Sequence, residues 1–170
     1  MIKRGILTFA VLIVLVSFAS ANLIVQDKLS LRGDGITYFE INGTTPYPII
    51  KPDANFKFVK ASSDVFDKVY QSSGYFRTKF NNKDNLYIKL GQRKNNLNIT
   101  QFDSSVIIGS ADATITLRMN NKKETIKKFM INYNVNRINN TMTIESNDTE
   151  LQFKIEFPYE VPISWTYEID

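Results

Sequence analysis

The side chains that most often carry enzyme chemistry are missing from this chain. Its 170 residues include no cysteine and no histidine. Their absence excludes cysteine nucleophiles, Ser-His-Asp triads and the zinc sites that cysteine and histidine build. Carboxylates, hydroxyls and lysines remain as the groups that could do chemistry.

Acidic residues are frequent, but no pair of them is set apart by its spacing. Glycoside hydrolysis requires two carboxyl groups about 5 to 10 Å apart in a cleft, and Asp64 with Asp67 or Glu156 with Glu160 are typical of the pairs at hand. A calcium loop requires alternating acids with a glycine, and no such run surrounds Asp53. We therefore expect no enzymatic activity, no cofactor and no metal site.

One covalent modification does have a sequence signature, and it is N-glycosylation. The acceptor pattern Asn-X-Thr begins at Asn42, Asn98, Asn139 and Asn147. Asn139 and Asn147 fall in expected turns, and Asn98 occupies the polar parity of a short expected strand, so these three should face water. N-linked glycans are therefore expected partners.

An amphipathic strand with a flexible joint lies near the N-terminus, in residues 22–35. Aliphatic and polar side chains alternate there with the period of two that a half-buried strand requires. Gly33-Asp34-Gly35 ends the strand and is interpreted as a hinge. Each large aliphatic side chain left in water would cost about 1.5 to 3 kcal/mol, so this strand must pack in its own sheet or in that of a neighbour. The aliphatic residues are Leu23, Val25, Leu29 and Leu31.

Residues 1–21 have the three parts of a secretory signal peptide. Lys3 and Arg4 form a positive start, Ile6 to Val16 form an apolar core, and Ala19-Ser20-Ala21 form a small-residue cleavage pattern. We expect cleavage after Ala21, export to the cell surface, and contact with a membrane only through the removed leader.

Two alternatives remain open for the same segment. If it is never cut, its apolar character continues to Val25 and is long enough to span a membrane. If it is cut after Gly5, it leaves an apolar N-terminal helix as in type IV pilins, although Thr8, Phe9 and Ala10 lack the acidic residue usual in that family.

The mature chain is expected to form a single domain over residues 36–170, preceded by the strand and hinge. Removing residues 1–21 leaves 149 residues, enough for one domain with a core. Loss of Lys3 and Arg4 lowers the net charge from +4 to +2. Because the remaining lysines are spread along the chain, nucleic acid is not an expected partner.

Alternating patterns in most of the chain predict an all-β fold. Residues 113–119 and 129–135 alternate apolar and polar side chains around a turn at Asn120-Asn121-Lys122-Lys123, which predicts a hairpin. Strands recur about every ten residues, as in sandwiches and barrels. We expect an Ig-like antiparallel β-sandwich of about 8–10 strands with an N-terminal amphipathic strand.

Two further segments add to this pattern. Odd positions from 151 to 169 are nearly all apolar or aromatic, which predicts a last strand that bends or lies at an edge near Pro158 and Pro162. Only Ser63 to Tyr70 has helical spacing, with Ser63 as its cap.

The layout resembles that of the thread-type surface filaments of archaea, whose subunits are exported, heavily N-glycosylated, Ig-like pilins joined by donor-strand complementation. The matching features are the cleavage pattern, the strand in residues 22–35 with its glycine joint, the glycosylation patterns and the lack of cysteine. The resemblance implies a homopolymer in which each subunit donates its N-terminal strand head-to-tail to the next. Bacterial chaperone–usher pilins share this principle, but this chain lacks their cysteine pair and their penultimate tyrosine.

A second resemblance suggests a different function. The segment from Ala113 through Ile131 resembles part of the YceI-like lipid-binding barrels, although Asn120 to Thr125 replace the His-Gly-Val typical of that family. This implies an exported carrier of a lipid or isoprenoid, with aromatic residues lining a cavity. A monomeric surface adhesin is the third alternative.

Overall fold

The structure is a computed structural model that describes residues 23–62, 68–91 and 97–162. The predicted signal peptide, most of the predicted helix and the last part of the predicted C-terminal strand lie outside these residues. Within them the chain forms ten strands and no helix, which confirms the all-β fold.

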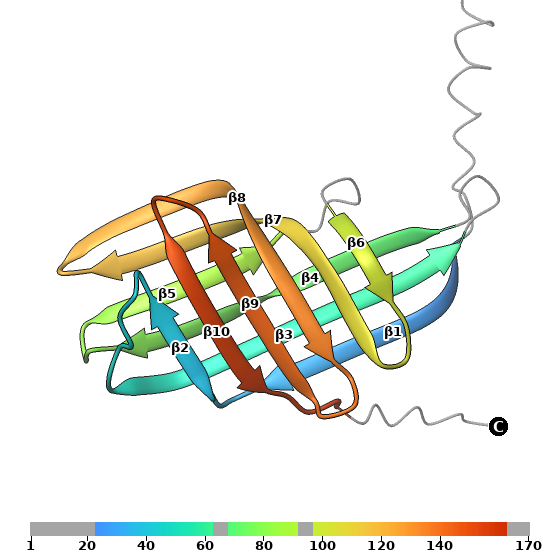
Figure 1. Cartoon of the computed structure of the whole chain (residues 1–170), viewed down its shortest axis with the longest axis horizontal. Helices are drawn as coiled ribbons and strands as arrows, with labels where there is room; N and C mark the ends of the chain where they lie inside the picture. The colour runs from blue at the N-terminus through green and yellow to red at the C-terminus, as the bar shows by residue number, and fades with distance from the viewer. Residues whose placement is uncertain (1–22, 63–67, 92–96, 163–170) are drawn as a thin grey trace, which may run out of the picture.

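All ten strands belong to one antiparallel sheet that does not close into a barrel. Its order is β1-β3-β4-β5-β7-β8-β9-β10-β2, and β6 pairs with β7 beside this path. The strands, shown in Figure 1, are β1 (Ile24–Gly33), β2 (Tyr38–Ile41), β3 (Ile49–Ser62), β4 (Val69–Phe80), β5 (Asp84–Leu90), β6 (Leu97–Phe102), β7 (Val106–Met119), β8 (Lys122–Asn136), β9 (Thr141–Asn147) and β10 (Gln152–Pro158).

The sheet folds over on itself into two layers that cross (Figure 1). The back layer holds β1, β3, β4 and β5, and the front layer holds β6, β9, β10 and β2. The long strands β7 and β8 belong to both layers, since residues 107–111 of β7 pair with β6 and residues 113–118 pair with β5. A bulge between Ala113 and Ile115, and a φ of 56° at Lys128, mark the bend. The arrangement is consistent with a sandwich.

Aromatic rings from both layers fill the space between them. Phe157 of β10 stacks on Phe56 of β3 and Phe76 of β4, with ring centroids 6.3 and 5.6 Å apart. Phe58 of β3 meets Tyr133 of β8 at 5.2 Å. Because the chain has no cysteine, this packing and the strand ladders hold the layers together.

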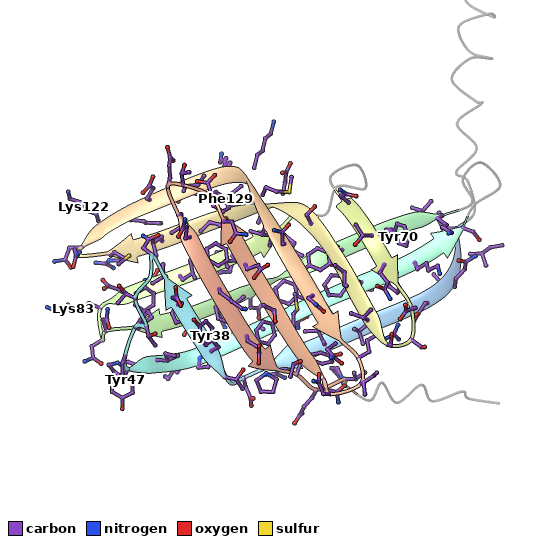
Figure 2. The ribbon with its side chains drawn as sticks, viewed as in Figure 1. Tyr38, Tyr47, Tyr70, Lys83, Lys122 and Phe129 are labelled. Atoms are coloured by element: carbon purple, nitrogen blue, oxygen red, sulfur yellow. The ribbon has the colours of Figure 1, made fainter. Side chains whose placement is uncertain are left out.

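The predicted hairpin is confirmed in β7 and β8. Asn120 and Asn121 join the strands with φ values of 50° and 64°, as a type I′ turn requires at both central positions. This turn and the β4–β5 turn lie at the same end of the molecule, as Lys122 and Lys83 show in Figure 2.

The predicted helix is wrong at its last two residues. Val69 and Tyr70 open β4, where Tyr70 pairs with Lys60 of β3 and stacks on Phe102 of β6 at 5.8 Å. Pairing with a distant strand overrides the local helical spacing at these positions.

The predicted C-terminal strand is confirmed in residues 152–158, which form β10, but the described residues after Pro158 belong to no strand and Glu160 makes only an isolated bridge. β10 lies between β9 and β2, and Pro158 follows the last residue of β10 that pairs with β2, Glu156. Pro158 is therefore placed where the missing N–H breaks no ladder to β2. The apolar side chains on the inner parity of β10 and its two flanking residues are all buried: Leu151, Phe153, Ile155, Phe157 and Tyr159.

Candidate functional site

The N-terminal strand, predicted to be donated between subunits, pairs within its own chain in this structure. β1 runs antiparallel to β3 from Ile24 opposite Ser62 to Gly33 opposite Ala54, at one edge of the sheet. Leu29 and Leu31 are 5% and 1% exposed. They lie opposite Phe58 and Phe56, so they belong to the core.

The expectation that the whole strand has one apolar face is wrong for its first two aliphatic residues. Leu23 and Val25 are 39% and 57% exposed. The register shifts at a bulge at Gln26: Val25 pairs with Ala61, whereas Asp27 pairs with the preceding residue of β3, Lys60. A bulge reverses the parity of the residues beyond it, but Ile24, on the other parity, is 64% exposed as well, so this end of β1 is exposed on both faces.

Asp27 has the same inner parity as Leu29 and Leu31 and binds Arg137 there. Arg137 follows β8 and donates from Nη1 and Nη2 to the two Asp27 oxygens, at 2.6 and 3.2 Å. The hydrogen bond from Arg137 holds the pKa of Asp27 below its ordinary value, against an opposing effect of desolvation. Arg137 Nη1 also donates to the Asp103 carbonyl at 2.7 Å. We call this Asp27–Arg137 pair the clasp, since it joins β1 to the front layer.

Sequence reasoning missed the clasp because nothing local indicates it. The two residues are 110 positions apart, and neither belongs to a motif. A polar residue at position 27, inside an otherwise aliphatic parity, is the only signal that could have suggested a buried partner.

The predicted hinge begins at a tightly packed residue. A side chain on Gly33 would place its Cβ 2.8 Å from Phe157 and 2.9 Å from the Pro158 carbonyl oxygen. The neighbouring Arg32 exchanges two backbone hydrogen bonds with Glu160, at 2.9 and 2.8 Å. Gly33 therefore allows a close approach of β1 to the segment after β10. Asp34 and Gly35 then lead the chain across to β2.

All four predicted glycosylation asparagines are exposed. Asn42 follows β2, Asn98 lies in β6, Asn139 lies in the β8–β9 turn, and Asn147 is the last residue of β9. The Thr141 hydroxyl donates to the side-chain oxygen of Asn139 at 2.8 Å, within the same acceptor pattern. Each acceptor asparagine is thus accessible, and its glycosylation stays a prediction.

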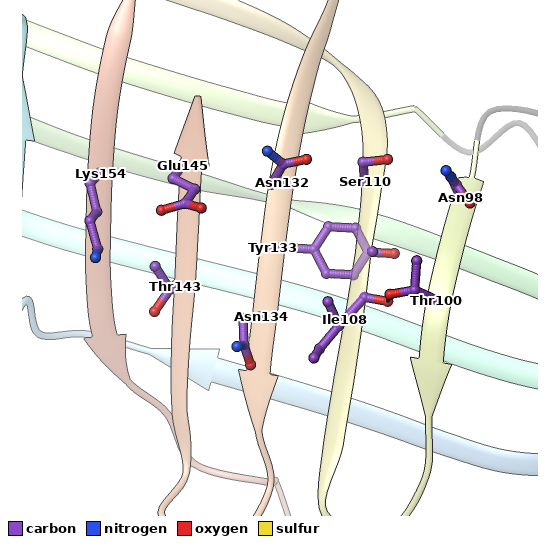
Figure 3. A pocket seen from close by; sticks show the side chains of 11 residues that line it. Asn98, Thr100, Ile108, Ser110, Asn132, Tyr133, Asn134, Thr143, Glu145 and Lys154 are labelled. Atoms are coloured by element: carbon purple, nitrogen blue, oxygen red, sulfur yellow. Dashed lines mark hydrogen bonds between the residues drawn. The ribbon is translucent and has the colours of Figure 1, made fainter. Parts of the chain in front are cut away.

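A polar groove of about 560 Å³ crosses the outer face of the front layer near Asn98. Figure 3 shows a row of side chains on neighbouring strands along it. Its amide, hydroxyl and charged groups can hydrogen-bond to a ligand rich in hydroxyls. The row runs Asn98, Ser110, Asn132, Glu145 and Lys154.

The floor of this groove contains Tyr133, whose ring lies against Gly109. A Cβ on Gly109 would fall 2.7 Å from the Tyr133 hydroxyl and 2.7 Å from the Asn98 carbonyl oxygen. Among the described residues, the Tyr133 hydroxyl is buried without a hydrogen-bond partner. Desolvation raises the pKa of Tyr133 far above its ordinary value.

The candidate acids form no catalytic arrangement in the part of the chain that the structure describes. Glu156 accepts a hydrogen bond from the Thr37 hydroxyl at 3.2 Å, and Glu160 takes part in the backbone bridge to Arg32. Asp64 and Asp67 lie outside the description. Residues 23–62, 68–91 and 97–162 contain no cluster of three acids that could hold a metal. They also include no helix with the length and apolar character to cross a membrane.

Comparisons with known proteins add no assignment. The chain matches no protein-family model, no curated protein and no solved structure.

Proposed function

We propose that this protein is an exported structural subunit of an extracellular filament, and that its copies join head-to-tail by exchanging β1. The observation that carries the proposal is the position of β1. It is the first described strand, it lies at an edge of the sheet, and β3 is the single described strand that pairs with it, apart from the bridge between Arg32 and Glu160. The same ladder can therefore form with β3 of another copy.

Exchange would preserve the contacts that β1 makes. Burial of Leu29 and Leu31, at about 1.5 to 3 kcal/mol each, and the clasp from Asp27 to Arg137 both join β1 to the rest of the domain. A donated strand carries these side chains into the neighbouring copy. Because the donating and accepting surfaces differ, successive exchange grows an open chain of subunits.

The surface of the molecule suits an extracellular glycoprotein. The four acceptor asparagines are exposed, and a glycan on Asn98 would begin at one end of the polar groove. The aromatic residues that suggested a lipid carrier have a packing role, since rings such as Phe56, Phe76 and Phe157 contact one another. No observation favours the carrier or the adhesin over the filament subunit.

Engineered cysteines can distinguish pairing within a chain from pairing between chains, because the chain has none of its own. Ser30 and Lys57 face each other across β1 and β3. We expect that Ser30→Cys and Lys57→Cys, each in a separate chain, form a mixed disulfide dimer after the two are unfolded and refolded together. The double variant should give a ladder of oligomers on a non-reducing gel.

A matched control uses the β4–β5 hairpin. Lys79→Cys with Asn85→Cys joins two register partners within one hairpin, and this pair should stay monomeric under the same oxidation. If the Ser30 and Lys57 single variants form no mixed dimer, and their double variant gives only an internal cross-link, β1 stays in its own sheet and the proposed exchange is wrong.

A further inference from the structure

The outer face of the back layer gathers cations that are scattered along the sequence. The register places Arg32, Asn55, Tyr75 and Lys89 in one row across four strands. A second row contains Lys79, Asn85, Arg118 and Lys123. Among the described residues on the outer parity of β1, β3, β4, β5 and the part of β7 and β8 that pairs with β5, Asp53 is the single acid, and Asp112 of β7 lies at the border with the front layer. The cations of this face are Lys28, Arg32, Lys57, Arg77, Lys79, Lys89, Arg118 and Lys123.

The outer face of the front layer has the opposite tendency. Its described charged residues are Glu40, Glu145 and Glu156 with one cation, Lys154, in rows that cross β2, β9 and β10. If the front layer of a second copy packed on the basic face, its outer face would therefore place three acids and one cation against the eight cations. The basic face calls for a partner with more negative charge than another subunit carries.

A groove on the basic face contains aromatic and hydrogen-bonding groups. The bulge between Ile50 and Asp53, where Lys51 has a φ of 49°, bends β3 beside β4 and β5. The groove there measures about 540 Å³. Its lining includes Lys51, Asp53, Arg77, Lys79, Asn85 and Tyr87.

Residues that line this groove are held in place by contacts with one another and with the neighbouring Tyr75. Arg77 Nη2 lies 2.7 Å from Asp53, and its guanidinium sits 5.6 Å from the centre of the Tyr75 ring. Tyr75 donates to Asp53 at 3.2 Å, and its ring lies 6.1 Å from that of Tyr87. These contacts fix the orientation of the aromatic side chains before any ligand binds.

We propose that this basic face binds an acidic polysaccharide, with one sugar unit in the groove beside Tyr87 and neighbouring units along the rows of lysine and arginine. On a sheet, such side chains recur about every 4.8 Å between strands and about 6.8 Å along a strand, which suits a polymer with regularly repeated anions. Lys79 and Lys89 would bind carboxylates or sulfates. Asn85 and Thr116 offer hydrogen bonds to sugar hydroxyls.

The aromatic geometry favours a polysaccharide over single-stranded nucleic acid. Base stacking requires free ring faces. Here Arg77 lies over Tyr75, the rings of Tyr75 and Tyr87 lie against each other at 38°, and both side chains are half-buried. The groove is built from β3, β4 and β5, so the proposal does not depend on whether β1 is exchanged.

Binding of the full-length protein to immobilised polygalacturonate tests the proposal, with neutral dextran and poly(dT) as comparison ligands. We expect saturable binding to polygalacturonate, none to dextran and weaker binding to poly(dT). The double variant Lys79→Gln with Lys89→Gln should bind polygalacturonate about tenfold or more weakly, because two charge-assisted contacts are lost. Lys154→Gln on the front layer is the matched control and should bind as the original chain does.

Four results would overturn the proposal. The first two are absence of binding to polygalacturonate and equal or tighter binding to poly(dT). The third is a loss of polygalacturonate binding by Lys154→Gln that equals the loss by the double variant. The fourth is a change in self-association of the double variant without polysaccharide, which would assign the face to a second copy. Thermal unfolding of each variant confirms that the fold is retained. Cysteine cross-linking of β1 is measured without polysaccharide. Failure of the proposed exchange and failure of the proposed polysaccharide binding can therefore be told apart.

Discussion

At the scale of single residues, the enclosed hydroxyl of Tyr133 is an unpaired polar group in the core. It lies beside Gly109 and has no hydrogen-bond partner among the described residues. A buried polar group without a partner costs about 1 to 3 kcal/mol. The ring itself contributes to packing, since it lies 5.2 Å from Phe58. The hydroxyl and the ring therefore have opposite effects on stability.

We expect Tyr133→Phe to leave the free energy of unfolding unchanged or to raise it by about 1 to 2 kcal/mol, because the ring stays and the unpaired hydroxyl is removed. Denaturant unfolding measures the change. Tyr159→Phe is the control: its hydroxyl donates to the Asn136 carbonyl at 3.1 Å, and its removal should lower stability by about 0.5 to 1.5 kcal/mol. If Tyr133→Phe lowers the free energy of unfolding by more than about 1.5 kcal/mol, the Tyr133 hydroxyl has a hydrogen-bond partner after all.

At the scale of elements, β1 is joined to the molecule by its ladder with β3, two buried leucines, the clasp and the backbone bridge from Arg32 to Glu160. Asp27 lies on the inner parity of β1 with Leu29 and Leu31, and this position brings it to Arg137. The two clasp side chains are 18% and 30% exposed, so water screens their attraction only in part. The clasp is therefore the part of the attachment of β1 that depends on pH.

The sign of that dependence follows from the lowered pKa of Asp27. Both partners are charged at pH 7, and the stabilisation is fully present above the ordinary carboxyl pKa of 3.8. It is lost as the pH falls below this value and through the lower pKa of the folded state. We expect Asp27→Asn to unfold more easily than the original chain at pH 7, by about 1 kcal/mol, and the difference to shrink below pH 3.8.

Denaturant unfolding between pH 7 and pH 2 checks this expectation. Asp53→Asn is a comparison variant, because Asp53 pairs with a far more exposed arginine, Arg77, and should change stability less. A difference between Asp27→Asn and the original chain that stays constant down to pH 2 would show that the carboxylate charge is not what stabilises β1.

At the scale of the whole molecule, the two layers present different outer faces. The back layer is basic with an aromatic groove, and the front layer is lined by amides, hydroxyls and acids with Asn98 at one end of its row. β1 covers one edge of β3, and this edge would be left unpaired if β1 departed.

A chain that lacks residues 22–32 tests how far the domain depends on a covering strand. We expect it to be less stable by about 3 to 6 kcal/mol, because burial of Leu29 and Leu31 is lost, and to be rescued by a peptide of residues 22–32 added in trans. Thermal unfolding with and without the peptide measures both effects. A peptide with Leu29→Asp and Leu31→Asp is the control and should not rescue. Unchanged stability after the deletion would contradict this dependence.

Much of the fold could be predicted from residue order. Alternation at 113–119 and 129–135 identified a hairpin, and the run from Asn120 to Lys123 located its turn, because both signals depend on local backbone geometry. The turn itself is shorter than predicted, since Lys122 and Lys123 belong to β8. The inner parity of β10 was predicted for the same reason. The helical pattern at Val69 and Tyr70 failed where pairing with β3 decided the conformation.

The candidate site was predictable in part. The acceptor asparagines and the buried Leu29 and Leu31 follow from local pattern and parity. The exposure of Val25, the clasp and the gathering of cations do not, because each depends on the register between strands that are far apart in sequence. A bulge shifts that register by one residue and exchanges the two faces of a strand.

Residue order by itself thus determined which segments form strands and which of their side chains are apolar, since these depend on a period of two along the chain. Only the tertiary structure decided that the sheet bends at β7 and β8 into two layers, that Asp27 meets Arg137, and that one outer face is basic. The physical reason is that bulges, layer crossing and charge placement arise from pairing between distant strands, which no local periodicity contains.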